Sequence, residues 1–148
     1  RSLLDASIEG SLRHESPVTG LFRTATRDVD LGGVTVREGQ WVWAAYAAAN
    51  HDGAKYIEPD AFDIGRFPHG PRSADHMAFG HGEHHCIGAG LARTEARIAF
   101  DRLLDRTIDI RLTPDANSFD VNPSFVLRGI EALHVDIDPA IASQKGNP

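Results

Sequence analysis

Hydrophobic residues recur at helical spacing in two stretches of the chain. The first stretch has leucine or isoleucine at every fourth position and predicts a helix over residues 2–13. Pro17 follows, and the residue before a proline is pushed out of helical geometry, so this helix should end before it. The second stretch predicts a helix over residues 89–106 with a core-forming stripe of Ala92, Ala96, Ala99 and Leu103.

Between and after these helices the pattern is mainly that of β-strands. Runs of β-branched and aromatic residues are separated by glycine-containing turns, which is typical of short antiparallel strands. The strands are expected at residues 22–31, 34–36, 40–45 and 108–112, and within 120–136. A short alanine-rich helix is expected at residues 44–49. The pattern therefore predicts a chain that contains both helices and strands.

Composition narrows the classes of function. The chain has 148 residues and a net charge of -6, and nucleic-acid binding calls for a basic face, so we expect no nucleic-acid partner. No apolar run approaches the length of a membrane span and no signal peptide is evident, which predicts no membrane partner. One cysteine excludes an internal disulfide and fits the cytoplasm. The first residue is Arg1, not methionine, so we expect the start of the protein to be missing.

The chemistry of the chain is concentrated in the loop of residues 79–88, FGHGEHHCIG, which contains the single cysteine, Cys86. Two glycines precede Cys86 and one follows it, so the loop can fold closely beneath a flat ligand. The predicted helix begins directly afterwards, and its free N–H groups and positive dipole end favour a thiolate. A thiolate is a strong iron ligand.

Two other interpretations of this loop are open. A lone cysteine is often a small buried hydrophobic residue. The cluster of His81, His84, His85 and Cys86 could instead hold zinc. Zinc sites commonly draw their ligands from two separate short pairs, whereas all four candidates lie on one tight loop. The spacing therefore disfavours zinc.

The ten loop residues read aromatic, Gly, any, Gly, any, His, any, Cys, apolar, Gly, and in this they resemble the cysteine-ligand loop of the cytochrome P450 family of haem-thiolate monooxygenases. The resemblance implies haem b as cofactor, with Cys86 as the axial ligand of the iron. It also implies that His84 and Arg23 hold the haem propionates. The implied cofactor-binding set is Cys86, His84, Arg23, Phe79, Gly80, Gly82, Ile87 and Gly88.

The resemblance also sets expectations for the whole chain. Residues 1–138 would be the C-terminal part of a single haem-thiolate domain that is incomplete at its N-terminus. The implied fold class is α+β, with a small β-sheet and a helix after the cysteine loop, in a family that is mainly helical when complete. Residues 139–148 would be a flexible tail. The implied activity is insertion of one oxygen atom from O2 into a small apolar substrate, with electrons from a ferredoxin-type or flavodoxin-type donor. No catalytic residue beyond the haem ligand is expected in these residues, so the fragment alone should not turn over substrate. The alternative is a degenerate or stand-alone haem-binding module without oxygenase activity.

Two further groups of residues match family segments. Candidates for substrate contact are Val18, Thr19, Leu21, Phe125 and Val126, for which plain strand packing is the alternative. Arg93 and Arg97 resemble the positive patch at which the family docks its electron donor, with a solvated helix face as the alternative.

The first helix departs from the family pattern. The family carries a Glu-x-x-Arg pair, in which Arg13 occupies the arginine position and Gly10 occupies that of the glutamate. The family's third network member corresponds to Arg66. Two buried arginines without an anion are costly, so Glu9 either replaces the missing carboxylate or forms only a solvated pair with Arg13. His76 is expected at the surface.

Overall fold

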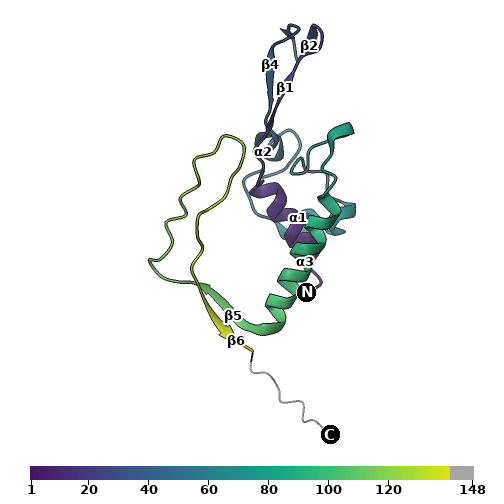
Figure 1. The fold of residues 1–148 in the computed structure, drawn as a ribbon. Helices are drawn as coiled ribbons and strands as arrows, with labels where there is room; N and C mark the ends of the chain where they lie inside the picture. The colour runs from purple at the N-terminus through teal and green to yellow at the C-terminus, as the bar shows by residue number, and fades with distance from the viewer. Residues whose placement is uncertain (141–148) are drawn as a thin grey trace.

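A computed structural model describes residues 1–140 of the chain. Its two main helices are α1, Leu4–His14, and α3, Ala89–Arg106, with the short α2, Tyr46–Asn50, between them. Three single-turn 3-10 helices also lie between α2 and α3: η1 (Ile64–Arg66), η2 (Gly70–Arg72) and η3 (Gly82–His84). In Figure 1, α1 and α3 lie side by side at the centre. The sequence patterns therefore placed all three α-helices to within about two residues, as expected for strongly periodic or well-punctuated segments.

The strands form three separate two-stranded antiparallel ladders instead of one sheet. Strand β1, Leu21–Thr24, pairs with β4, Trp41–Ala44. Strand β2, Val29–Leu31, pairs with β3, Val34–Val36, across the glycine turn, and together the four strands form the long hairpin that projects from the top of Figure 1. Strand β5, Thr107–Leu112, follows α3 directly and pairs with β6, Val135–Pro139.

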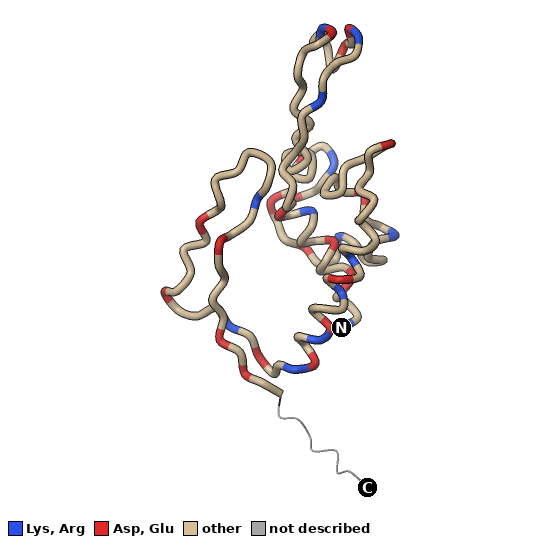
Figure 2. Tube along the Cα trace, in the orientation of Figure 1, with Lys and Arg blue, Asp and Glu red and all other residues tan. Residues whose placement is uncertain are grey.

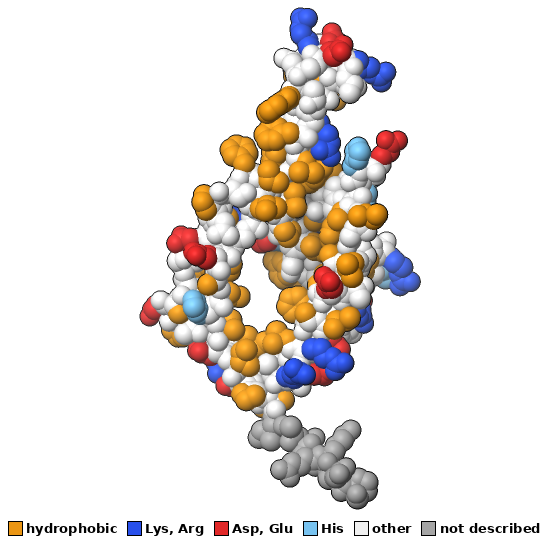
Figure 3. Space-filling model, in the orientation of Figure 1, with side chains coloured by type: hydrophobic (Ala, Val, Ile, Leu, Met, Phe, Trp, Pro, Cys, Tyr) orange, Lys and Arg blue, Asp and Glu red, His pale blue; other side chains and the backbone are white. Residues whose placement is uncertain are grey.

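The core lies around α1 and the segments that wrap it. Ala6 and Ile8 of α1 are buried, as are Tyr46, Tyr56 and Phe67 from the following segments. Buried polar side chains also occur here, among them Glu9, Arg13 and Asn50. The strands expose large apolar residues. Figure 3 shows hydrophobic side chains around an opening between α3 and the segment that follows it. The packing that fixes the candidate site is therefore concentrated at α1.

Four sequence-based predictions about elements were wrong. The predicted strand 22–31 is interrupted between β1 and β2. Residues 120–136 are mostly irregular, with isolated bridges at Val121–Ile130 and Val18–Leu127, and only the start of β6 falls within them. The predicted flexible tail, residues 139–148, starts too early in the chain. Pro139 is in β6, and the Ala140 N–H donates to the Arg106 carbonyl at 2.8 Å. The last eight residues of the predicted tail lie outside the described part. In α3 only Ala89 is buried among the described residues, so the alanine stripe forms no buried core there.

Among the helices that the structure describes, none has the length and apolar character needed to cross a bilayer.

Candidate functional site

The loop before α3 is held in a tight conformation by glycine geometry and by backbone hydrogen bonds. Gly80 and Gly82 have φ values of 72° and 74°, in the left-handed region that other residues rarely adopt. The Cys86 N–H donates to the Phe79 carbonyl at 2.9 Å, and the His85 N–H donates to the Gly82 carbonyl at 3.0 Å. The loop thus closes on itself from Phe79 to Cys86.

Cys86 lies at the start of α3 with its thiol exposed. A Cβ built on Gly88, which caps the helix, would lie 3.7 Å from the Cys86 Sγ. The sulfur is therefore next to the helix N-terminus, where no side chain caps the free N–H groups. The partial positive charge of the helix N-terminus is therefore close to the sulfur.

A cavity of about 480 Å³ opens over the sulfur. Its walls come from α1, the entry to β1, the start of α2, the cysteine loop and the distant segment near residue 126. The lining residues are Leu12, Pro17, Val18, Leu21, Tyr46, Ala78, Phe79, Gly80, His84, Cys86, Val126 and Leu127. Most of these are apolar, so the cavity suits a flat hydrophobic ligand with a few polar groups at its edge.

The cavity gathers residues that are far apart in sequence. From the cofactor-binding set it contains Cys86, His84, Phe79 and Gly80, and from the substrate set it contains Val18, Leu21 and Val126. The bridge between Val18 and Leu127, with the Thr19 N–H donating to the Val126 carbonyl at 2.8 Å, joins the two substrate segments.

Arg23 approaches the cavity from β1. Its Nη2 donates to the Tyr46 hydroxyl at 3.2 Å, and Tyr46 is a wall residue that also borders Gly80 of the loop. Arg23 is thus one side chain away from the cysteine loop.

Three predicted residues face elsewhere. Thr19 and Phe125 line a different surface depression with Trp43, and the Thr19 hydroxyl donates to the Phe125 carbonyl at 2.9 Å. Ile87 is fully exposed. None of these three residues lines the cavity that contains Cys86.

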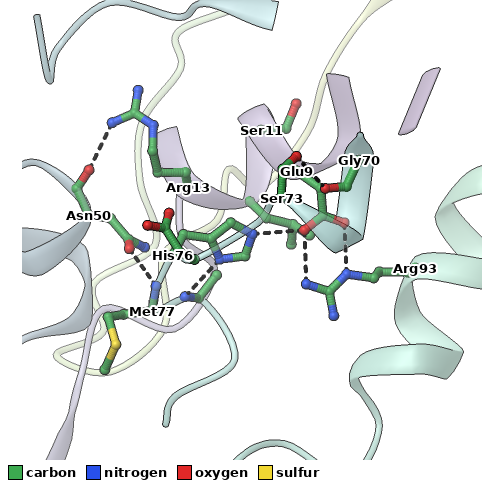
Figure 4. Close-up of polar contacts among 12 residues, drawn as sticks. Glu9, Ser11, Arg13, Asn50, Gly70, Ser73, His76, Met77 and Arg93 are labelled. Atoms are coloured by element: carbon green, nitrogen blue, oxygen red, sulfur yellow. Dashed lines mark hydrogen bonds and ion pairs between the residues drawn. The ribbon is translucent and has the colours of Figure 1, made fainter. Parts of the chain in front are cut away.

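Glu9 has partners that the sequence did not indicate. Its carboxylate is completely buried and accepts two hydrogen bonds from Arg93, from Nε at 2.7 Å and from Nη2 at 2.8 Å. It also contacts the His76 Nε2 at 3.0 Å, and Figure 4 shows the three side chains converging between α1 and α3. Both expectations for Glu9 are wrong, since it is neither a solvated partner of Arg13 nor the anion of the Arg13–Arg66 pair. His76 is buried instead of lying at the surface.

Burial raises the pKa of the Glu9 carboxyl, but the hydrogen bonds and charges of His76 and Arg93 outweigh it, so its pKa lies below the ordinary value. The carboxylate is therefore charged over the physiological range.

Arg13 is buried without a carboxylate partner. Its guanidinium donates to three backbone carbonyls, those of Asn50, Pro59 and Ala61, at 2.7 to 2.8 Å. Within residues 1–140, the Nε atoms of Arg13 and Arg66 are buried without a hydrogen-bond partner, and neither guanidinium forms an ion pair. Burial and then the charge of Arg66 lower the pKa of Arg13.

Tyr56 and Phe62 occupy the space around these arginines. The Arg13 and Arg66 guanidinium carbons lie 5.2 and 5.7 Å from the centroid of the Tyr56 ring, within cation–π range. A Cβ built on Gly10 would lie 3.3 Å from the Phe62 ring. The Phe62 ring therefore packs where a glutamate side chain at position 10 would begin.

The structure does not place Arg93 and Arg97 together on one exposed positive face of α3. Arg93 points inward, with its guanidinium bound to Glu9 and lying 4.5 Å from the Phe79 ring centroid, so it is not a free surface cation. Arg97 is exposed and forms an ion pair with Asp5 of α1. Figure 2 shows charges of both signs along α3 instead of a continuous positive face.

Several site residues escaped the sequence reasoning. Tyr46 and Leu12 line the cavity, while His76 and Asn50 are buried and do not line it. Asn50 accepts a hydrogen bond from the Met77 N–H at 2.6 Å and donates to the Ser16 hydroxyl at 2.7 Å. Only the apolar periodicity of Leu12 gave a local signal, because the other three act through contacts distant in sequence.

Metal coordination by side-chain clusters has no support in the described part of the chain. Across residues 1–140, no three His, Cys, Asp or Glu side chains form a group able to hold a metal ion. The described residues therefore contain no cluster of side chains that could bind zinc as predicted for the alternative site.

A cysteine beside a helix N-terminus and at an apolar cavity is compatible with a haem-thiolate site, in which a cysteine thiolate holds the iron. The family profile described as Cytochrome P450 matches residues 1–125, and the chain belongs to the cytochrome P450 family. Family members bind haem b, and the relatives named below include monooxygenases, which are oxidoreductases.

The relatives are bacterial. Cytochrome P450 107B1 of Saccharopolyspora erythraea is 47% identical over 135 residues, covering 90% of this chain and 32% of the relative. The biotin biosynthesis cytochrome P450 of Bacillus subtilis is 39% identical and covers 92% and 33%. The solved structure of the tirandamycin C-bound monooxygenase TamI matches with a TM-score of 0.84 and 40% identity, over 93% of this chain and 34% of that one. The chain thus spans about one third of the length of its relatives and has the fold of that part.

The residues present fit the family's cofactor. The exposed Cys86 sulfur faces an apolar cavity, and the left-handed Gly80 and Gly82 keep the loop free of side chains that would obstruct a flat macrocycle. His84 at the rim and Arg23 near it supply polar and cationic groups for carboxylates.

Proposed function

We propose that this chain is the cysteine-ligand part of a cytochrome P450 monooxygenase that inserts one oxygen atom from O2 into a small apolar substrate. The observation that carries the proposal is the single cysteine at the N-terminus of α3, exposed into a mostly apolar cavity of about 480 Å³. The 47% identity to cytochrome P450 107B1 supports it.

In this proposal Cys86 holds the haem iron through its thiolate. The positive dipole end of α3 lies beside the sulfur, and the hydrogen bond from the Cys86 N–H to the Phe79 carbonyl fixes the position of Cys86 in the loop. Haem with a thiolate ligand supplies O–O bond cleavage and oxidation of the substrate. The chain contributes the ligand, its orientation and one wall of the pocket.

The carboxylates of the haem would be held by His84 and Arg23. His84 lies on the cavity rim, and Arg23 is oriented by the Tyr46 hydroxyl at 3.2 Å. A cationic side chain and a carboxylate form strong charge-assisted hydrogen bonds. Loss of either group should weaken haem binding without removing the thiolate spectrum.

The substrate side of the pocket would be formed by Val18, Leu21 and Val126. These apolar side chains exclude water and give no hydrogen-bonding code for one compound, so the proposal extends only to the class of small apolar molecules. Thr19 and Phe125 would support this wall from behind instead of contacting substrate.

Electrons would come from a ferredoxin-type or flavodoxin-type protein. Arg97 remains the candidate for this contact, and Arg93 is better explained as a buried partner of Glu9. A cytoplasmic location stays a prediction.

The deciding experiment is the spectrum of the reduced, CO-treated protein reconstituted with haem. We expect the absorption band of thiolate-ligated haem, and we expect Cys86→Ser to abolish it while His84→Ala only reduces haem affinity. Stoichiometric zinc with no haem absorption would overturn the proposal, and a thiolate-type spectrum retained by Cys86→Ser would remove Cys86 from the ligand role.

A second function, a haem-binding module without oxygenase activity, is favoured by the partnerless Arg13 and Arg66 Nε atoms. The test is turnover by the full-length gene product supplied with electrons and a panel of apolar substrates. Thiolate-type spectra together with consistent loss of electrons to O2 without product would favour this alternative.

A further inference from the structure

Glu9 joins α1 to both sides of the cysteine loop. Its carboxylate binds Arg93 of α3, seven residues after Cys86, through two hydrogen bonds of 2.7 and 2.8 Å. It also binds His76, ten residues before Cys86, at 3.0 Å. We call Glu9, His76 and Arg93 the carboxylate clamp. Figure 4 shows the clamp bridging three segments that are separate in sequence.

Both ring nitrogens of His76 have a partner. The Ala78 N–H donates to the His76 Nδ1 at 3.3 Å, and the His76 Nε2 lies 3.0 Å from a Glu9 carboxylate oxygen. The ring is therefore oriented both by Glu9 of α1 and by the backbone of its own segment.

The clamp is largely buried, so its side chains are restricted to one hydrogen-bonded arrangement. The Glu9 and His76 side chains are each 1% exposed and that of Arg93 is 21% exposed. A paired guanidinium and carboxylate in such a place hold a fixed bidentate arrangement, and losing one partner leaves an uncompensated charge. The clamp can therefore hold a position as well as add stability.

Its effect reaches the sulfur through Phe79. The Arg93 guanidinium lies 4.5 Å from the Phe79 ring centroid, and the Phe79 carbonyl accepts the Cys86 N–H at 2.9 Å. Phe79 also lines the cavity over the sulfur. The path from Glu9 to Cys86 thus runs through two direct contacts and one backbone hydrogen bond.

We infer that Glu9 is a positioning residue for Cys86, acting through Arg93 and Phe79 to hold the sulfur in its place at the cavity, where it would bind the haem iron. The inference rests on the proposed function where it concerns haem. Its structural part, the ordering of residues 76–88 by Glu9, stands without the cofactor.

The test compares two acids of α1 that each pair with an arginine of α3. Glu9→Gln removes the buried charge, whereas Asp5→Asn removes the exposed carboxylate that pairs with Arg97. Hydrogen–deuterium exchange of the haem-free full-length gene product is followed in peptides covering residues 76–88 and in β5, which reports global unfolding. We expect Glu9→Gln to speed exchange at the Cys86 N–H by about tenfold or more, with β5 little changed, and Asp5→Asn to change neither. Exchange that rises equally in both peptides, or that matches Asp5→Asn, would overturn the inference.

Arg93→Lys provides a milder variant if Glu9→Gln does not fold. It keeps the positive charge but loses the two-pronged geometry and the planar contact with Phe79. With haem bound, we expect both variants to lower the fraction of reduced, CO-bound protein with the thiolate-type band, and Asp5→Asn to leave it unchanged. An unaltered fraction in both clamp variants contradicts positioning. If the unaltered protein does not bind haem at all, the proposed function fails, while the exchange experiment still decides the role of Glu9.

Discussion

Two arginines near α1, the buried Arg13 and the part-buried Arg93, are stabilised by different kinds of partner. Arg93 donates two hydrogen bonds to the Glu9 carboxylate. Arg13, one turn further along α1 than Glu9, donates to three backbone carbonyls and has Arg66 as its charged neighbour. A buried guanidinium therefore does not need a carboxylate if backbone dipoles surround it, although its pKa is then lowered, as it is for Arg13.

The comparison also shows how the chain accommodates Gly10. The carboxylate of Glu9, one position earlier, points to α3 and accepts its hydrogen bonds from Arg93 there. The Tyr56 ring and the carbonyls of residues 50, 59 and 61 take over the stabilisation of Arg13. The two arginine sites are thus independent in their partners, and each can be altered without removing a ligand of the other.

The largest effect is expected from breaking the carboxylate site. Glu9→Gln should reduce the free energy of unfolding by about 3 kcal/mol, because Arg93 and its charge remain largely buried. Chemical denaturation measures this change. Asp5→Asn is the matched control and should change the same quantity by less than about 1 kcal/mol. Equal losses in the two variants would show that burial of the Glu9 pair confers no special stability.

Measuring stability against pH tests whether the stability lost in Glu9→Gln comes from the charge of Glu9. The pKa of Glu9 is lower in the folded protein than its ordinary value of 4.5. Its contribution is therefore complete above the unfolded pKa and is lost as the pH falls through the folded pKa. The stability difference between the unaltered protein and Glu9→Gln should be constant near neutrality and shrink as the pH falls below about 4.5. A difference that grows on acidification would contradict the sign of the shift.

The carbonyl-bound site can be tested by supplying the carboxylate that it lacks. Gly10→Glu places a carboxylate one helical turn before Arg13, and Gly10→Ala controls for helix propensity, which alone contributes about 1 kcal/mol. Both side chains must displace the edge of the Phe62 ring slightly. We expect Gly10→Glu to be more stable than Gly10→Ala by about 1.5 kcal/mol, measured by thermal or chemical unfolding. If the two are equally stable, a carboxylate from position 10 does not reach the arginines.

The smallest effect is expected on the exposed arginine of α3. Arg97→Ala removes only a solvated ion pair with Asp5 and should change stability by about 0.5 kcal/mol or less. If Arg97 contacts an electron donor, the same variant should raise the KM for that donor with little effect on haem binding. Steady-state kinetics with a ferredoxin-type donor provides the measurement, and an unchanged KM would remove Arg97 from the interface.

The sequence predicted what depends on local geometry. The helix over residues 89–106 could be predicted because alanine and leucine recur in it at helical spacing, and the loop before it could be interpreted from the spacing of its glycines around Cys86. The first helix and the turn between β2 and β3 could also be predicted, because they too depend on the local pattern of residues.

The sequence failed where a partner lies far along the chain. Glu9 was compared with Arg13, four residues away, but its true partners are 67 and 84 residues away. His76 gave no local sign of burial, since a histidine in a Gly- and Pro-rich segment is usually exposed. Residues 120–136 alternate well enough for strands but have few pairing partners among the described residues, so they remain mostly irregular.

The carbonyl cage around Arg13 has a consequence for how this protein can change over generations. A carboxylate ligand is lost by one nucleotide change in its codon, but a peptide carbonyl is present whatever residue occupies its position. The acceptors at residues 50, 59 and 61 are therefore protected from most point mutations, provided that the backbone keeps its course. An arginine held in this way tolerates drift at neighbouring positions, and a glycine at position 10 is a substitution that such a site can accept.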